Sequence, residues 1–204
     1  ASLPGAVEPP DAPSAVSTTD VRGRYGFFGD VAAGRYVLHL ARPGYTPALR
    51  RLPLAPGSGA VPFDARLTPL GEPSAERLDP AIGGSFENSG DTGDTGGVSA
   101  DALLLEVAPS PFAPGVSVPS GTLGVRLTPL SAQALPELLP LGWSPLSAAD
   151  VRLETEGASP APLPQSARFA AGAVHLTLPL PAHTPPTASL VAVRHDVASG
   201  RWIT

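Results

Sequence analysis

The sequence contains no cysteine, no methionine and no lysine among its 204 residues. Without cysteine, disulfide bonds, thiolate metal sites and cysteine nucleophiles are all excluded. Without lysine, an internal lysine–asparagine isopeptide bond is excluded as well. Because methionine is absent too, we expect the chain to be an internal or processed piece of a longer protein.

Charged and aromatic residues are also scarce, at 15% and 5% of the chain. The net charge is −5, and the 13 basic residues are scattered arginines. A nucleic-acid-binding protein needs a clustered basic surface, so we expect no nucleic-acid partner. No apolar run approaches the roughly 18 residues that a membrane-spanning helix requires, so we expect no membrane span.

Proline and glycine are abundant, with 27 and 22 residues. This content interrupts helices and suits short strands joined by many turns. Hydrophobic residues make up 42% of the chain, which is enough for packed cores. We therefore predict an all-β protein made of two tandem antiparallel β-sandwiches, transthyretin-like or Ig-like, joined by a Gly/Asp-rich linker.

Residues 16–70 have the pattern of a small sandwich, in which strands alternate with turns about every ten residues. The clearest strand is 35–41, where Tyr36, Leu38 and Leu40 fall on one face by the period of two. The expected strands are 16–20, 24–28, 35–41, 49–54 and 61–67.

The turn between the first two expected strands has a specific chemistry. We expect Gly23 to adopt a positive φ angle and the Asp20 carboxylate to accept hydrogen bonds from amides of the turn. Tyr25, Tyr36 and Tyr45 are expected to fill the small core, with their hydroxyl groups at its rim.

Three short motifs follow one another in this region: Thr19-Asp20-x-x-Gly23-x-Tyr25, Gly34-x-Tyr36 and Pro43-Gly44-Tyr45. Their order resembles the carboxypeptidase-regulatory-like family, which has a transthyretin-like sandwich. The resemblance implies such a domain at residues 1–70. The family's first strand is missing before Leu3, which implies a sheet edge that is unpaired or filled by a strand from elsewhere.

The composition changes between residues 71 and 101, where a polar stretch leads into the low-complexity run ENSGDTGDTGG. We predict a flexible linker at 71–101 and a domain boundary there. We expect this run to be a solvated linker that binds no metal or cofactor. The alternative is a Ca²⁺ site, for which Asp91 and Asp94 are the candidate oxygen ligands, although the EF-hand spacing is not met.

The segment 102–204 is predicted to be the second sandwich. Its strand-like runs are 102–107, 116–118, 123–128, 149–153, 173–180 and 189–194, and one helical turn can form within 131–141. The motifs Gly96-Gly97-Val98, Leu127-Thr128-Pro129 and Gly200-Arg201-Trp202 occur in the order of a ZU-type sandwich, which the second half resembles. The tandem organisation is similar to that of teneurins and bacterial Rhs (YD-repeat) proteins, which implies a secreted or cell-surface bacterial protein.

Catalytic motifs are absent from the sequence. There is no G-x-S-x-G elbow and no phosphate-binding loop. The histidines His39, His175, His183 and His195 lie one per element, outside any zinc motif, and we expect them to be surface or rim residues and not metal ligands. His195 and Asp196 are adjacent on an expected strand, so they point to opposite faces and form no dyad. We predict that the protein is not an enzyme.

The densest apolar stretch outside the expected strands is Leu135–Pro145, LPELLPLGWSP. Trp143 could cap a core, or it could dock on a neighbouring domain, as tryptophan often does. Trp143 and Leu139 are therefore the candidate interaction residues.

These observations favour a non-catalytic structural or interaction module, acting as a spacer, plug or docking unit of a larger secreted or surface bacterial protein. The expected partners are other domains of that protein, or another chain that supplies an edge strand. The alternative is a carbohydrate- or protein-binding module that uses its sandwich loops.

Overall fold

A computed structural model describes residues 15–27, 32–57, 66–88, 103–116, 121–155, 163, 168–181, 184, 190–196 and 201–204. Across these ranges the chain is all-β, as predicted, and the one helical element is a short 3₁₀ turn, η1 (Ala132–Ala134). Among the same residues, no helix has the length and apolar character that crossing a membrane requires.

The described strands form four small antiparallel sheets. Two are hairpins, β1–β2 and β9–β10, and two have three strands, in the orders β3-β6-β7 and β4-β5-β8. The strand bounds are β1 (Gly34–Leu40), β2 (Ala48–Leu54), β3 (Pro73–Leu78), β4 (Gly84–Glu87), β5 (Leu104–Val107), β6 (Leu123–Pro129), β7 (Ala149–Thr155), β8 (Val174–Thr177), β9 (Arg194–Asp196) and β10 (Arg201–Ile203).

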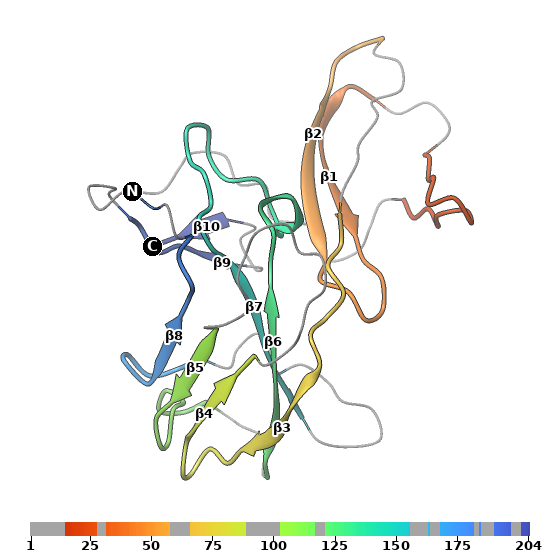
Figure 1. Ribbon diagram of the computed structural model, residues 1–204. Coiled ribbons are helices and arrows are strands. Elements are labelled where there is room, and N and C mark those ends of the chain that lie inside the picture. Colours follow the sequence, from red (N-terminus) through yellow and green to blue (C-terminus); the bar gives the residue numbers. More distant parts are fainter. Residues whose placement is uncertain are drawn as a thin grey trace.

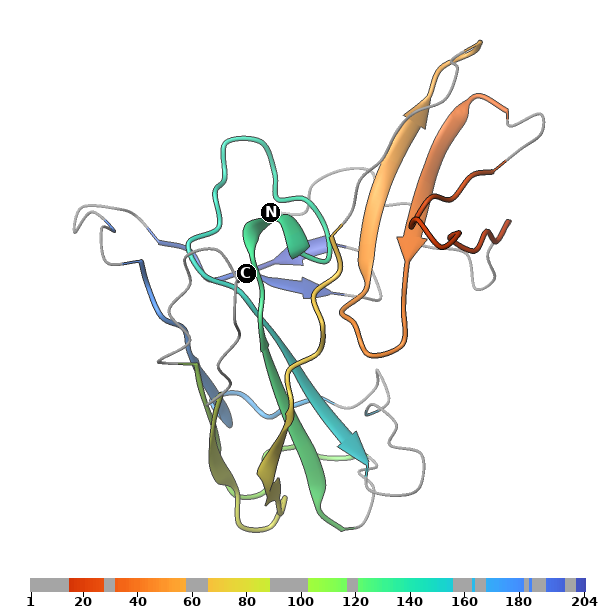
Figure 2. The same ribbon diagram turned by 45° about the vertical axis from the view of Figure 1, so that its right-hand side comes forward.

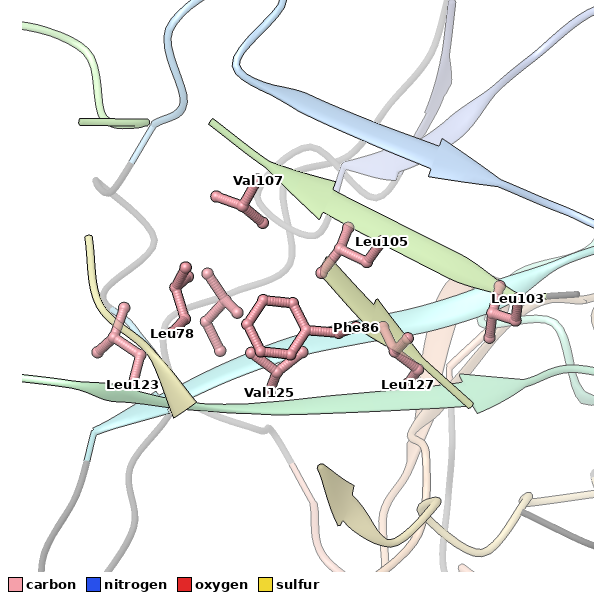
Figure 3. Close-up of a cluster of buried hydrophobic side chains, with 9 residues drawn as sticks. Leu78, Phe86, Leu103, Leu105, Val107, Leu123, Val125 and Leu127 are labelled. Carbon is pink, nitrogen blue, oxygen red and sulfur yellow. The ribbon is translucent and has the colours of Figure 1, made fainter. Parts of the chain in front are cut away.

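The two three-stranded sheets pack together in the lower half of Figure 1. Their central strands, β5 and β6, supply most of the core, and Figure 3 shows these side chains meeting between the sheets. β6 is the central strand of its sheet, between β3 and β7, and it is buried at six of its seven positions. The segment that leads into β3 also lies beside β6, since Thr128 Oγ1 accepts a hydrogen bond from the Gly71 amide at 2.9 Å. The buried cluster comprises Leu78, Phe86, Leu103, Leu105, Val107, Leu123, Val125, Leu127 and Leu153.

The strands β3 and β4 correct the predicted linker at 71–101 over the part that the structure describes. Each contributes one large apolar side chain to the core, Leu78 at 0% and Phe86 at 2% exposure. The remaining side chains of β3 are mostly polar and exposed, and its pairing with β6 shifts register between Pro73 and Arg77. The composition of such a short, irregular edge strand resembles that of a linker, which is why the sequence predicted a linker here.

The chain crosses from one sheet to the other in the tight turn between β3 and β4. The Asp79 carbonyl accepts hydrogen bonds from the amides of Ile82 and Gly83, and its carboxylate accepts one from Ala81 at 2.8 Å. Gly83 has a φ angle of +79°, and a Cβ atom there would lie 2.3 Å from the Val107 carbonyl oxygen. The turn therefore requires glycine for both its conformation and its packing.

The N-terminal region forms the β1–β2 hairpin, which stands apart from sheet β4-β5-β8 in Figures 1 and 2. The predicted alternation along 35–41 is confirmed, since Tyr36, Leu38 and Leu40 are half-buried and the residues between them are exposed. In the described residues, this region contributes a two-stranded sheet and no sandwich. Tyr25, like Tyr36, is half-buried rather than central to a core.

The expected strands 16–20 and 24–28 are not strands over residues 16–27. The predicted turn chemistry is nevertheless confirmed: Gly23 has a φ angle of +75°, and the Asp20 carboxylate accepts hydrogen bonds from the Arg22 and Arg24 amides at 2.8 and 2.9 Å. Val16 and Val21 are 79% and 103% exposed. Without an apolar face to bury, the flanking segments do not extend into a sheet.

Most strands expected in the second half are found. The runs 102–107, 123–128, 149–153 and 173–180 contain or overlap β5, β6, β7 and β8, and η1 lies within 131–141. The last run, 189–194, is extended only at its end, where β9 begins. Residues 61–65 and 117–118, which were expected to be strands, lie outside the described residues.

Replacing Gly83 by alanine is expected to destabilise the protein by more than about 2 kcal/mol, because positive φ and the clash with the Val107 carbonyl add together. Gly115→Ala is the matched control: its φ angle is +81°, but nothing lies within 4 Å of its Cβ position. Urea denaturation followed by circular dichroism measures both. Equal losses in the two variants would contradict the packing role of Gly83.

Candidate functional site

The most distinctive feature outside the core is the long connection between β6 and β7, residues 130–148, called here the β6–β7 loop. A hydrogen bond from the Leu130 amide to the Ala148 carbonyl closes its base at 2.9 Å. From there the loop rises away from the two three-stranded sheets and reaches between the β1–β2 and β9–β10 hairpins (Figures 1 and 2). It thereby contacts elements from both ends of the chain.

Arg50 on β2 binds the backbone of this loop on the side of the β1–β2 hairpin. Its side chain is only 3% exposed. Nη1 donates to the carbonyls of Leu135 and Pro136 at 3.1 and 3.2 Å, and Nη2 lies 3.4 Å from that of Gln133. These carbonyls follow or end the η1 turn, where helical hydrogen bonding leaves acceptors unpaired. The guanidinium group therefore acts as a cap for the loop backbone.

The backbone of β2 adds a second attachment. The Leu49 amide donates to the Pro136 carbonyl at 2.6 Å, so the loop pairs with the outer edge of β2. Burial of Arg50 lowers the pKa of its guanidinium, and the negative charge of Glu137 opposes this effect. The buried charge is thus compensated by carbonyl dipoles and by one carboxylate nearby.

Glu137 lies at the centre of a charged cluster that we call the polar junction, formed by Arg50, Arg51, Glu137 and His195. The Glu137 side chain is 11% exposed; Oε1 accepts a hydrogen bond from Arg51 Nε, and Oε2 lies 3.4 Å from His195 Nε2. His195 Nε2 is buried, and its contact with the carboxylate does not have the geometry of a hydrogen bond. One carboxylate thus bridges β2 and β9.

Two opposing influences set the pKa of the Glu137 carboxyl. Burial is the largest single one and raises the pKa, but the contacts with His195 and Arg51 together outweigh it. The pKa is therefore lowered below its ordinary value, so the folded protein favours the ionised carboxylate.

Trp202 completes the attachment on the far side. It pairs with His195 in the β9–β10 ladder, and the two rings meet edge to face with centroids 5.3 Å apart. The indole Nε1 donates to the Leu138 carbonyl at 3.2 Å. The C-terminal hairpin β9–β10 thus forms a hydrogen bond with Leu138, the residue that directly follows Glu137.

The structure places the predicted interaction residues on the same loop, beyond the polar junction. Trp143 is 47% exposed, so it does not cap a core. Leu139, four residues before Trp143, is half-buried. Asp91 and Asp94, the candidate Ca²⁺ ligands, lie outside the described residues, and among the residues that are described no three acidic or histidine side chains gather as a metal site.

The histidines differ in their exposure. His39 and His175 are exposed, as expected, and His183 lies outside the described part of the chain. His195 is intermediate in exposure as a residue, which fits a rim position, but its side chain is only 6% exposed because the β9–β10 hairpin folds it against Glu137. The sequence did not predict this contact, since the partner lies 58 positions away in the chain.

The sequence analysis did not identify Arg50, Arg51, Glu137 and Trp202 as a group. Two signals pointed toward them. A pair of arginines interrupts the otherwise apolar run 48–54, and Glu137 is the single charge in LPELLPLGWSP. A charge within an apolar segment is buried only when it is paired, so each signal calls for a partner of opposite sign.

Comparison of the chain with family models, with curated proteins and with solved structures gives no match. The resemblances to carboxypeptidase-regulatory-like and ZU-type domains therefore stay predictions.

Replacing Glu137 by glutamine is expected to lower stability near neutral pH by about 1–3 kcal/mol, because the Arg51 guanidinium loses its countercharge and an amide group replaces the buried carboxylate beside His195. The lowered pKa fixes the sign of the pH dependence. The carboxylate contributes stability above its ordinary pKa of 4.5, and this contribution is lost as the pH falls through the lower folded-state value. The difference between variant and wild type should therefore shrink in acid.

Glu106→Gln is the control, because Glu106 is an exposed carboxylate on β5. Urea titrations at neutral and at acidic pH measure all three proteins. A Glu137→Gln variant as stable as Glu106→Gln, or one whose deficit grows in acid, would contradict the role assigned to the polar junction.

Proposed function

We propose that this chain is a non-catalytic structural and interaction module of a larger secreted or surface bacterial protein. Its role is to hold separate chain segments in one arrangement and to present a surface to a neighbouring domain or protein. The observation that carries this proposal is the polar junction, which joins β2, the β6–β7 loop and β9.

The groups of the polar junction support a structural role over a catalytic one. An acid–base pair must reach a substrate, but the Glu137 and His195 side chains are 11% and 6% exposed. The second oxygen of the Glu137 carboxylate is engaged by Arg51, and the Arg50 donors face backbone carbonyls. These are the contacts of a structural ion-pair network.

The interaction surface that we propose is the tip of the β6–β7 loop. Leu138, Leu141 and Trp143 are 63%, 102% and 47% exposed there. The Trp143 amide donates to the Pro140 carbonyl at 3.1 Å, and Gly142 has a φ angle of +87°, so a tight turn presents Leu141 at its apex. Exposed leucine and tryptophan on a turn fixed at its base suit a protein neighbour.

The finer architecture belongs to the same proposal. The sandwich of residues 73–177 would be one unit, and the region of β1 and β2 would belong to an incomplete carboxypeptidase-regulatory-like unit. The order of the turn motifs around Gly23 and Gly44 supports this reading. Export to the cell surface follows from that resemblance and from the similarity in organisation to teneurin and Rhs proteins.

Leu141→Asp and Trp143→Ala are expected to change stability by less than about 1 kcal/mol, because both side chains face solvent. Leu105→Ala, at a position 2% exposed, should cost about 2–5 kcal/mol and sets the scale. Thermal unfolding measures the three variants. A Trp143→Ala protein that unfolds like Leu105→Ala would show that the tryptophan belongs to the core.

The interaction itself is tested in the full-length parent protein. A photo-crosslinking amino acid at position 141 should form an adduct with another domain or with a partner protein, while the same probe at the exposed His175 on β8 should not. Mass spectrometry identifies the adducts. Equal yields at both positions, or adducts only within the β6–β7 loop, would overturn the proposal.

A further inference from the structure

The outer edge of β1 has the properties of a strand-acceptor site. The Leu49 amide points away from β1, since it donates to the Pro136 carbonyl. In an antiparallel ladder, two directly opposite residues either both direct their amides toward each other or both direct them to the outer edges of the pair. The partner of Leu49 is His39, and the register of the hairpin is regular. The amides of Arg35, Val37 and His39 therefore all point to the outer edge.

No backbone hydrogen bond joins Arg35, Val37 or His39 to another element of the described chain. The opposite edge of the hairpin is closed, because Leu49 is bonded to the β6–β7 loop and Pro53 has no amide hydrogen. The hairpin is thus fixed along one edge, and along the other it carries a row of donors and acceptors that no other element of the described chain uses. Such an edge is a template for an additional strand.

The charge of the hairpin defines the kind of strand that fits. Residues 34–54 contain four arginines, Arg35, Arg42, Arg50 and Arg51, and no acidic residue, although the chain as a whole has a net charge of −5. Arg35 and His39 are exposed and share one face with Val37, which is 40% exposed. Directly opposite residues of neighbouring strands share a face, and opposite charges there are stabilising.

We propose that the outer edge of β1 binds an extended, acidic segment of another domain or protein as an additional antiparallel strand. Acidic side chains of that segment lie beside Arg35 and His39, and apolar side chains lie beside Tyr36 and Leu38 on the half-buried face. The inference rests on the proposed function, because it assigns partner chemistry to the same module. A second copy of this chain fits the edge poorly, since it would bring two basic hairpins together.

The first test is the free chain itself. Amide hydrogen exchange measured by NMR should alternate along β1: slow at Tyr36, Leu38 and Leu40, which bond to β2, and fast at Arg35, Val37 and His39. Uniform protection along β1 in the monomer would mean that the edge is already covered, and would overturn the proposal.

The second test uses peptides of seven residues, the length of β1, with alternating glutamate and valine. Binding to the full chain is followed by fluorescence anisotropy. In an antiparallel addition, the residues that bond to β1 are those beside Arg35, Val37 and His39, which are the glutamates. N-methylation of the glutamate amides should weaken binding at least about tenfold, while N-methylation of the valine amides should leave it within about threefold.

Replacing glutamate by lysine in the peptide should abolish binding, and Arg35→Glu in the protein should restore it. Val37→Pro removes an outward amide without breaking a bond to β2, and should weaken binding at least about tenfold, with Val37→Thr as the control. Because the N-methylated peptides use the unmodified protein, the result does not depend on the folding of Val37→Pro.

Three results would overturn the proposal: equal effects of the two methylation patterns, equal binding of the lysine peptide, and a dimer in sedimentation that Val37→Pro dissociates. The last would mean that a second copy occupies the edge. None of these results bears on the cross-linking and stability measurements at the β6–β7 loop, so failure of this inference and failure of the proposed function are distinguishable.

Discussion

The arrangement of this protein depends on how the backbone of the β6–β7 loop satisfies its carbonyl groups. The loop contains three prolines and rises away from the sheet of β6 and β7, so hydrogen bonds of that sheet do not reach its carbonyls near residues 133–136. Arg50 supplies the donors, because one planar guanidinium group carries several N–H groups in a fixed geometry. A buried arginine is stable only where such acceptors surround it.

Attachment of the loop to β2 also places Glu137. Its carboxylate lies between Arg51 on one side and His195 on the other, and the neighbouring carbonyl of Leu138 accepts from Trp202. The N-terminal and C-terminal hairpins thus meet through one short segment. Two small sheets of two strands each are marginal alone, and this shared contact gives them a common support.

The sequence predicted those features that depend on neighbouring residues. Alternation identified β1, and the chemistry of Asp20 and Gly23 identified the turn that precedes it. The sequence did not predict strands β3 and β4. Each of them buries a single large side chain, so the hydropathy of these segments does not differ from that of a linker. The polar junction was missed because its members come from three distant segments.

The exposure of Trp143 shows the same limit. The sequence left open whether this side chain caps a core or faces a neighbour, because an apolar run is compatible with both. The fold decides between solvent and core, at 47% exposure. The identity of a partner depends on surfaces outside this chain. The residues of this chain indicate only the chemical character of the partner.

Arg50 fixes the β6–β7 loop on β2 and thereby positions Glu137 and Leu138 for their contacts with the β9–β10 hairpin. Hydrogen-exchange mass spectrometry of Arg50→Met measures this directly, with Arg35→Met as the control at an exposed arginine of the same hairpin. The account predicts faster exchange in residues 46–54, in the β6–β7 loop and in residues 194–203 together, with β5 unchanged. Faster exchange confined to residues 46–54, or the same change in the Arg35→Met control, would contradict it.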